Sequence, residues 1–157
     1  MRKLFHIGLA VPELEKSMAE IGELFDLAWR PVRVAKMTLV DSNGRHSEVD
    51  VRVTFSIPGP FAVELWEAIP DTPLAMPESG YLHHVGYWVD DIAAESERLE
   101  ALGYAKVASS GTTPLFHQGP GGLLIEPEDV HVDRPSLRDL YPPDSEHAGD
   151  PVFTTAA

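Results

Sequence analysis

Two histidines of the chain, His6 and His84, stand in similar short phrases. The first phrase reads FHIGLAV and the second, 78 residues further on, reads HHVGYWV. In both, a glycine follows the repeated histidine by two positions, at Gly8 and Gly86. A single histidine at a strand end is usually solvated or capped, but imidazole is also the commonest metal ligand in proteins. Two imidazoles at equivalent positions of a repeat therefore indicate one shared metal site.

Both phrases have the alternation of a half-buried strand. Successive side chains of a strand point to opposite faces, so every second residue shares a face. The apolar residues Ile7 and Leu9 are then expected to pack against a helix, with His6 and Gly8 on the opposite face. The second strand repeats this pattern, so His84 is expected on its open face. A glycine on that face leaves room for a ligand.

Each half of the chain also places a carboxylate on the open face of a later strand. In FAVELWEA the alternation puts Glu64 on the face of Trp66, and in GGLLIEPED it puts Glu126 and Glu128 on one face. An unpaired carboxylate is costly to bury, and a metal ion removes that cost. The sequence thus predicts a set of two imidazoles and two carboxylates, the second carboxylate being Glu126 or Glu128.

The segments around these motifs predict the same order of elements twice. Apolar residues at helical spacing follow each histidine strand, and Gly103 marks a helix end in the second half. Further extended runs, rich in β-branched or alternating residues, are 32–40, 49–55, 61–68, 104–108, 114–117 and 121–129. Each half therefore reads βαβββ, and we expect an α+β fold of two tandem βαβββ modules. The expected divisions are a first module at 1–68, a linker at 69–80, a second module at 81–129 and a Pro- and Asp-rich tail at 130–157 that either wraps the surface or is disordered.

The composition limits the classes of partner and of site. The chain has 157 residues, a hydrophobic fraction of 43% and a formal net charge of −13, which describe a globular protein that repels nucleic acid. It has no cysteine, so disulfides and thiolate ligands are excluded and any metal takes nitrogen and oxygen ligands. No apolar run approaches the roughly 20 residues of a membrane span, and the N-terminal run is too short for a signal peptide. We expect a cytoplasmic protein with a small-molecule partner, no membrane partner and a homodimer as the assembly.

Taken together, FHIGLAVPELE with VELWE and HHVGYWVDDIA with GGLLIEP resemble the vicinal oxygen chelate superfamily over about residues 4–128. This superfamily includes glyoxalase I, methylmalonyl-CoA epimerase, extradiol dioxygenases and the bleomycin-binding proteins. The resemblance implies that the modules join into a cupped mixed sheet, with helices on the outside and a divalent metal in the cup. By position the metal ligands would be His6, Glu64, His84 and Glu126, which resembles the ligand sets of bacterial glyoxalase I and of the epimerases. No organic cofactor is expected.

The chain departs from glyoxalase I where that enzyme binds glutathione. Glyoxalase I commonly carries an arginine four residues after the first ligand and an asparagine four residues after the second, and these positions are Ala10 and Ala68 here. Without a guanidinium fork a glutathione carboxylate loses its best partner. The epimerases often carry a carboxylate base on the strand before the second ligand, and Glu48 lies about there.

The implied ligand set suits one divalent ion among Mn²⁺, Co²⁺, Ni²⁺, Fe²⁺ and Zn²⁺ and leaves two positions for neighbouring substrate oxygens. We therefore expect a metal-dependent isomerase, epimerase or lyase that acts on a small oxygenated substrate through a metal-stabilised enolate and proton transfer. Glu126, Glu64 or Glu48 would be the base.

Two other functions are compatible with the same fold. An extradiol-type dioxygenase needs two histidines and one carboxylate, so the additional Glu64 argues against it. A metal-free, drug-binding member of the fold lacks the ligands, so the complete set argues against that function as well.

Four other histidines are expected to lie outside the ligand set, His83 in a structural role and three at the surface rather than lining a pocket. His83 is expected on the core side of the strand that carries His84. His117, His131 and His147 are expected at the surface.

Overall fold

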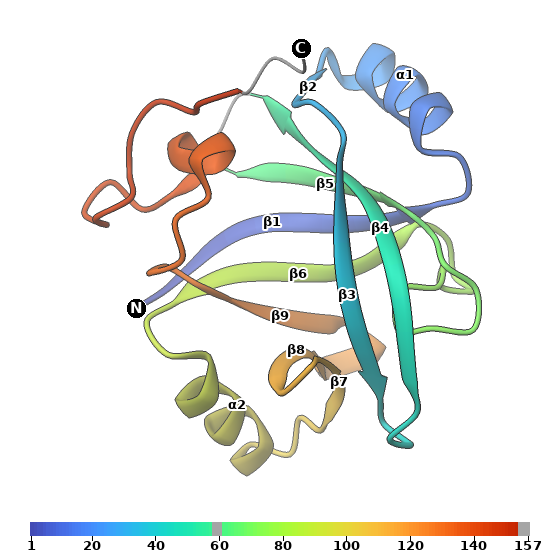
Figure 1. Cartoon of the computed structure of the whole chain (residues 1–157), viewed down its shortest axis with the longest axis vertical. Helices are drawn as coiled ribbons and strands as arrows, with labels where there is room; N and C mark the ends of the chain where they lie inside the picture. The colour runs from blue at the N-terminus through green and yellow to red at the C-terminus, as the bar shows by residue number, and fades with distance from the viewer. Residues whose placement is uncertain (58–60, 154–157) are drawn as a thin grey trace.

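The computed structural model describes residues 1–57 and 61–153 and has the α+β class expected from the sequence (Figure 1). The strands are β1 (Arg2–Val11), β2 (Ala28–Trp29), β3 (Arg33–Asp41), β4 (His46–Ile57), β5 (Ala62–Glu67), β6 (Leu82–Val89), β7 (Lys106–Ser110), β8 (Thr113–Gln118) and β9 (Leu124–Asp129). The helices are α1 (Leu14–Phe25) and α2 (Ile92–Ala101), with 3-10 turns at Pro120–Gly122 and Pro135–Leu140. Gly103, with a φ of 88° that favours glycine, follows α2 as the sequence predicts.

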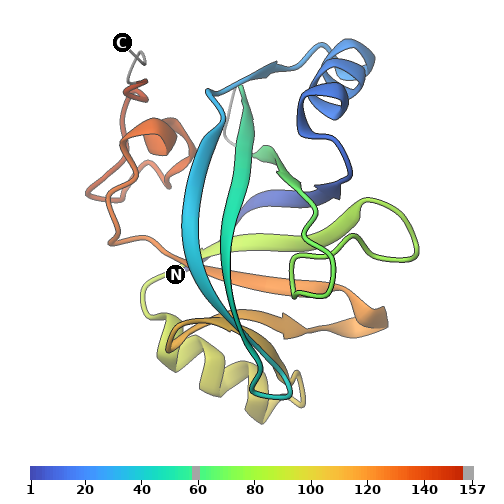
Figure 2. The same ribbon diagram turned by 45° about the vertical axis from the view of Figure 1, so that its right-hand side comes forward.

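The strands form one sheet that closes on itself. Hydrogen-bonded neighbours follow the order β2-β4-β3-β7-β8-β9-β6-β1-β5, and β4 also pairs with β5. The cupped mixed sheet that the resemblance implies is in the structure a closed barrel (Figures 1 and 2). The long β3–β4 hairpin closes it, because Leu39 on β3 pairs with Ser110 on β7 while Val53 on β4 pairs with Trp66 on β5.

The order of pairing is the same in the two halves of the barrel. In residues 2–67 it runs β1-β5-β4-β3, and in residues 82–129 it runs β6-β9-β8-β7. Antiparallel pairing of β1 with β6 joins the halves, with Ile7 opposite Val85. Each helix lies outside the barrel (Figure 1). Within the described ranges, neither helix is long and apolar enough to cross a membrane.

Two apolar clusters hold the barrel and its helices together. The larger one fills the barrel around Phe5, Trp66 and Phe116, each exposed by 3% or less. The smaller one joins α1 to the sheet through Val11, Leu14 and Leu65. Burial of one such side chain stabilises the fold by about 1.5–3 kcal/mol.

The C-terminal tail packs against the barrel over its described part. Of the two alternatives expected from the sequence, a tail that wraps the surface and a disordered tail, the described part has the first. Its apolar residues Val130, Leu137, Leu140 and Tyr141 are buried. The indole nitrogen of Trp88, inside the barrel, donates a hydrogen bond of 3.0 Å to the carbonyl of Leu140. Figures 1 and 2 show this segment, in orange and red, against one side of the barrel near the short strand β2.

Candidate metal centre

Four neighbouring strands bring two imidazoles and two carboxylates together inside the barrel. His6 lies on β1, Glu64 on β5, His84 on β6 and Glu126 on β9, and each is buried. One ligating atom from each residue lies within 4.8 Å of all the others. The structure thus gathers the four residues that the sequence and the resemblance suggested as ligands.

The distances within this group are close to those between ligands of one ion, with two of them, 2.7 and 2.8 Å, somewhat shorter. The two Nε2 atoms of His6 and His84 are 2.7 Å apart. Oε2 of Glu126 lies 3.2 Å from the first and 2.8 Å from the second, and Oε2 of Glu64 lies 3.4 Å from each. Adjacent ligands bonded at about 2.1 Å to one ion stand about 3.0–3.4 Å apart in octahedral or tetrahedral geometry. The donor set therefore fits a divalent metal ion.

The repeated glycines make room for the histidine rings. In the antiparallel pairing of β1 with β6, His6 lies opposite Gly86 and Gly8 lies opposite His84. A Cβ on Gly86 would stand 2.1 Å from Cε1 of His6, and a Cβ on Gly8 would stand 1.9 Å from Cε1 of His84. Each ring therefore occupies the space above the glycine of the other half, which is why the histidine and glycine recur together.

Aromatic side chains fix the orientation of the rings. Trp66 stacks on His84 with centroids 4.8 Å apart and planes 16° from parallel. Phe5 and Phe55 meet the His6 ring edge to face. Trp66 also lines the cavity beside the ligands.

His83 lies on the same side of β6 as its neighbour, contrary to the simple alternation. The pairing of β1 with β6 passes from Gly8 opposite His84 to Leu9 opposite Leu82, so His83 is the extra residue of a β-bulge. Its Nε2 lies 2.9 Å from the carbonyl oxygen of Pro73, which can only accept, so this nitrogen donates. Its Nδ1 then accepts from Nδ1 of His84, 3.3 Å away. Because Nδ1 of His84 carries the proton in this arrangement, its Nε2 carries the lone pair, which is directed at the other three ligand residues.

The electrostatics of the group favour positive charge at its centre. Burial opposes protonation of His84, but the Glu126 and Glu64 carboxylates outweigh it and raise the pKa of His84 to about 9. Burial likewise opposes ionisation of Glu126, yet His84 and His6 hold its pKa well below the usual range. A divalent cation satisfies both carboxylates and both imidazoles at once.

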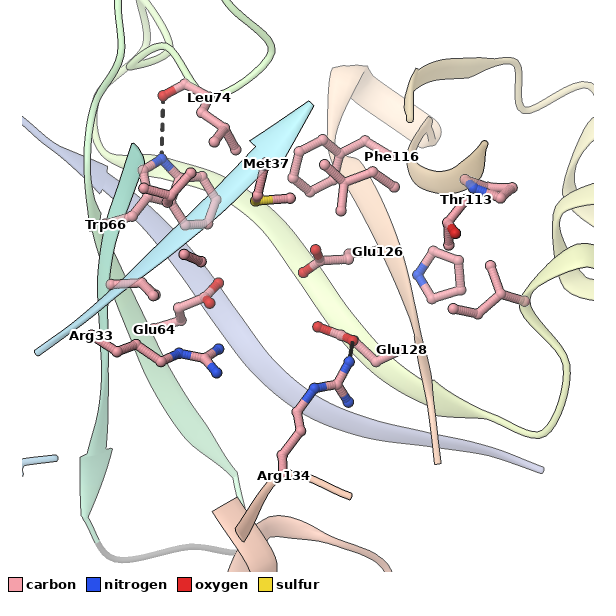
Figure 3. A pocket seen from close by; sticks show the side chains of 17 residues that line it. Arg33, Met37, Glu64, Trp66, Leu74, Thr113, Phe116, Glu126, Glu128 and Arg134 are labelled. Atoms are coloured by element: carbon pink, nitrogen blue, oxygen red, sulfur yellow. Dashed lines mark hydrogen bonds and ion pairs between the residues drawn. The ribbon is translucent and has the colours of Figure 1, made fainter. Parts of the chain in front are cut away.

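A cavity of about 220 Å³ adjoins Glu64 and Glu126 (Figure 3). Its far side carries Glu128, Arg33 and Arg134, and Figure 3 shows these three side chains on one side of the two ligand carboxylates. The rest of its wall is mainly apolar. The sequence left Glu126 and Glu128 as alternatives for the second carboxylate; the ligand group contains Glu126, and Glu128 pairs with Arg134 instead. Nothing local in the sequence indicated that the tail would contribute an arginine.

Glu48 does not join this group. It is exposed on β4, near the turn of the β3–β4 hairpin, where it pairs with Thr38. The cavity is lined instead by Val51 and Val53 of the same strand. Odd-numbered residues of β4 face the interior, so the alternation directs Glu48 outward.

One of the other histidines, His117, differs from its expected surface position. His117 is fully buried and its Nε2 lies 2.9 Å from the hydroxyl of Ser96 on α2. His147 is half-buried in the tail, where its Nε2 lies 3.0 Å from the carbonyl oxygen of His131. His131 is exposed, as expected.

Comparison with known proteins supports the family resemblance seen in the sequence. The family model of the glyoxalase/bleomycin resistance protein/dioxygenase superfamily matches residues 5–119. The chain is 27% identical over 134 residues to the ethylmalonyl-CoA/methylmalonyl-CoA epimerase of Cereibacter sphaeroides, a match that spans 82% of this chain and 91% of the relative.

Two solved structures have a similar fold. One is a Streptomyces coelicolor methylmalonyl-CoA epimerase variant in complex with 2-nitronate-propionyl-CoA, with a TM-score of 0.54, 14% identity, and coverage of 80% of this chain and 94% of that one. The other is a variant of 4-hydroxymandelate synthase from the same organism, with a TM-score of 0.55, 15% identity, and coverage of 91% of this chain and 39% of that one.

Proposed function

Because the chain belongs to the glyoxalase/bleomycin resistance protein/dioxygenase superfamily, we propose that it is a metal-dependent enzyme of the epimerase type, an isomerase or lyase in the broader sense. The observation that carries this proposal is the buried group of four ligands that opens onto a small cavity. The similarity to an ethylmalonyl-CoA/methylmalonyl-CoA epimerase supports it. The substrate in this proposal is a small molecule with neighbouring oxygens.

The ligands divide the work of holding the ion and moving the proton. Nε2 of His6, Nε2 of His84 and one oxygen each of Glu64 and Glu126 would hold the ion. When bound, the ion would act as a Lewis acid that polarises a substrate carbonyl and stabilises negative charge on its oxygen. The contacts with the histidines use Oε2 of each glutamate, so Oε1 of Glu126 or Glu64 is left to take the α-proton and return it.

We also propose that residues 1–68 and 81–129 are two copies of one βαβββ module, joined by the linker 69–80 and followed by the tail 130–157. The shared order of pairing in the two halves supports this. So does the reciprocal placement of each histidine over the other half's glycine. A homodimer is the proposed assembly, and light scattering of the full chain tests it.

The experiment is elemental analysis of protein purified without chelator, followed by incubation with methylmalonyl-CoA in deuterated water. We expect one divalent ion per chain and deuterium at the α-carbon. His84→Ala should abolish both, whereas His131→Ala, in an exposed tail residue, should change neither. Absence of metal from the wild-type protein, with thermal stability unchanged by chelation, would refute the proposal.

Oxygen uptake on catechols, measured in parallel, tests the dioxygenase alternative. Two carboxylates in the group leave fewer open positions than oxygen and a bidentate catecholate need together. We therefore expect no oxygen consumption. The metal-free binding protein is tested by the same elemental analysis.

A further inference from the structure

We infer that Arg134 of the C-terminal tail, together with Arg33, forms a subsite for a carboxylate group of the substrate. The inference rests on the proposed function, because it assigns the part of the substrate that lies away from the metal ligands. The family model ends at residue 119, so the tail that carries Arg134 lies beyond the matched region.

Arg134 is held firmly at the edge of the cavity. Its guanidinium group donates to Oε2 of Glu128 at 2.5 Å and to the carbonyl of Asp129 at 3.3 Å. It also lies over the ring of Trp88, 5.5 Å from the centroid. Its backbone nitrogen donates to the hydroxyl of Tyr141. A guanidinium group fixed in this way loses little conformational freedom when it binds an anion.

The tail itself is anchored by a second buried arginine. Arg30, exposed by only 2%, donates to the carbonyl of Ser136 at 2.7 Å and to Oδ2 of Asp139 at 2.8 Å. These contacts join the tail to the loop between β2 and β3. Arg134 is therefore a built part of the cavity wall.

Arg33 reaches the same side of the cavity from a different element. It lies on β3, with its guanidinium carbon 5.8 Å from the centroid of the Phe55 ring. In the part of the chain that the structure describes, it has no carboxylate within the 4.0 Å of an ion pair. Figure 3 shows the two guanidinium groups approaching the same space below Glu64 and Glu126. Arg33 thus brings a positive charge that the protein does not neutralise there.

The charge of the lining groups favours one negative charge on the ligand. Glu64, Glu126 and Glu128 carry three negative charges and Arg33 and Arg134 carry two positive ones, which leaves one net negative charge. A divalent ion on the first two carboxylates turns this into one net positive charge. This net charge favours a monoanionic group, and Arg134 contributes more to it than the exposed Arg33, whose charge water screens.

The kind of anion follows from what Arg134 already binds. Its partner in the structure is a carboxylate, that of Glu128, and a guanidinium fork matches the planar geometry of such a group. A phosphate dianion would exceed the single positive charge of the metal-loaded cavity. We therefore assign the subsite to a substrate carboxylate that displaces Glu128 from Arg134.

Calorimetric titration of the metal-loaded full chain near neutral pH tests the subsite, with monomethyl malonate, dimethyl malonate and inorganic phosphate as probes. Arg134→Gln should weaken binding of the monoester by about tenfold or more, because hydrogen bonds between charged groups are lost, while binding of the diester, which has no carboxylate, should change little. Arg138→Gln is the matched control, since Arg138 lies on the same tail and pairs with Asp133 outside the cavity. Glu128→Gln should tighten binding of the monoester, because it removes the carboxylate that competes for Arg134.

Elemental analysis of each variant separates this inference from the proposed function. If the wild-type protein holds no metal, the proposed function fails. If metal is retained but Arg134→Gln binds monomethyl malonate as tightly as the wild type, the subsite is refuted. Phosphate binding as tight as binding of the monoester, lost in Arg134→Gln, would refute the carboxylate assignment in favour of a phosphate subsite.

Discussion

Replacement of Gly86 by alanine should remove the metal without unfolding the barrel. The added Cβ would lie 2.1 Å from Cε1 and 2.5 Å from Nε2 of His6. An ordinary contact needs at least 3.4 Å, so the ring must retreat by 1.3 Å (3.4 minus 2.1). Metal–ligand distances tolerate only about 0.2 Å. Phe5 and Phe55 contact the His6 ring edge to face, so the ring has little room to move away from the added methyl group.

The size of the effect can be stated for both metal binding and stability. Disturbing an outer-shell partner of a ligand typically costs about 10–100-fold in metal affinity, so displacement of the ligand itself should cost at least about 100-fold. Overpacking costs about 1–3 kcal/mol. For a domain of this size that corresponds to a melting temperature lower by about 2–12 °C.

The assay is metal titration against a competing chelator, with circular dichroism to follow the fold. Gly149→Ala is the control, because a Cβ there meets no atom within 4 Å. We expect the control to match the wild type. A Gly86→Ala protein that binds metal with unchanged affinity would refute the argument that this glycine exists to seat the His6 ring.

Three further predictions follow from other parts of the structure. Glu126→Gln should lower the rate of α-proton exchange by about 10²–10⁴-fold, whereas Glu48→Gln should leave it within about twofold because Glu48 is exposed. Equal losses in the two variants, measured by deuterium incorporation, would contradict a base within the ligand group. His83→Ala should weaken metal binding by about 10–100-fold, since it frees the Nδ1 side of the neighbouring ligand ring; an unchanged chelator competition curve would show that the ring needs no such partner. Burial opposes ionisation of Glu95, but hydrogen bonds from arginine side chains and a tyrosine outweigh it and hold its pKa below the usual 4.5. This carboxylate therefore stabilises the fold above about pH 4.5, and the stabilisation is lost as pH falls below it. Glu95→Gln should accordingly lower the melting temperature at pH 7, with a difference from wild type that shrinks below pH 4; a difference independent of pH would contradict this.

The sequence by itself determined the local elements and the faces of the strands. Alternation is a property of the extended backbone, so it holds wherever the strand ends up. It placed His6 and His84 on the open faces of their strands. It also placed Glu64 and Glu126 on the open face of a later strand in each half. The same rule, applied to the valines of β4, directs Glu48 outward, so the position suggested by family resemblance was less reliable there than the alternation.

Only the tertiary structure decided which residues meet. The register of β1 against β6 seats each histidine over the opposite glycine, and the bulge turns His83 to the side of His84. The barrel closes through pairs such as Leu39 with Ser110, far apart in the chain. The tail brings Arg134 beside Glu128. These features depend on pairing and packing between segments that are distant in the chain. The free energy of such contacts is distributed over many residues, so no short stretch of sequence predicts them.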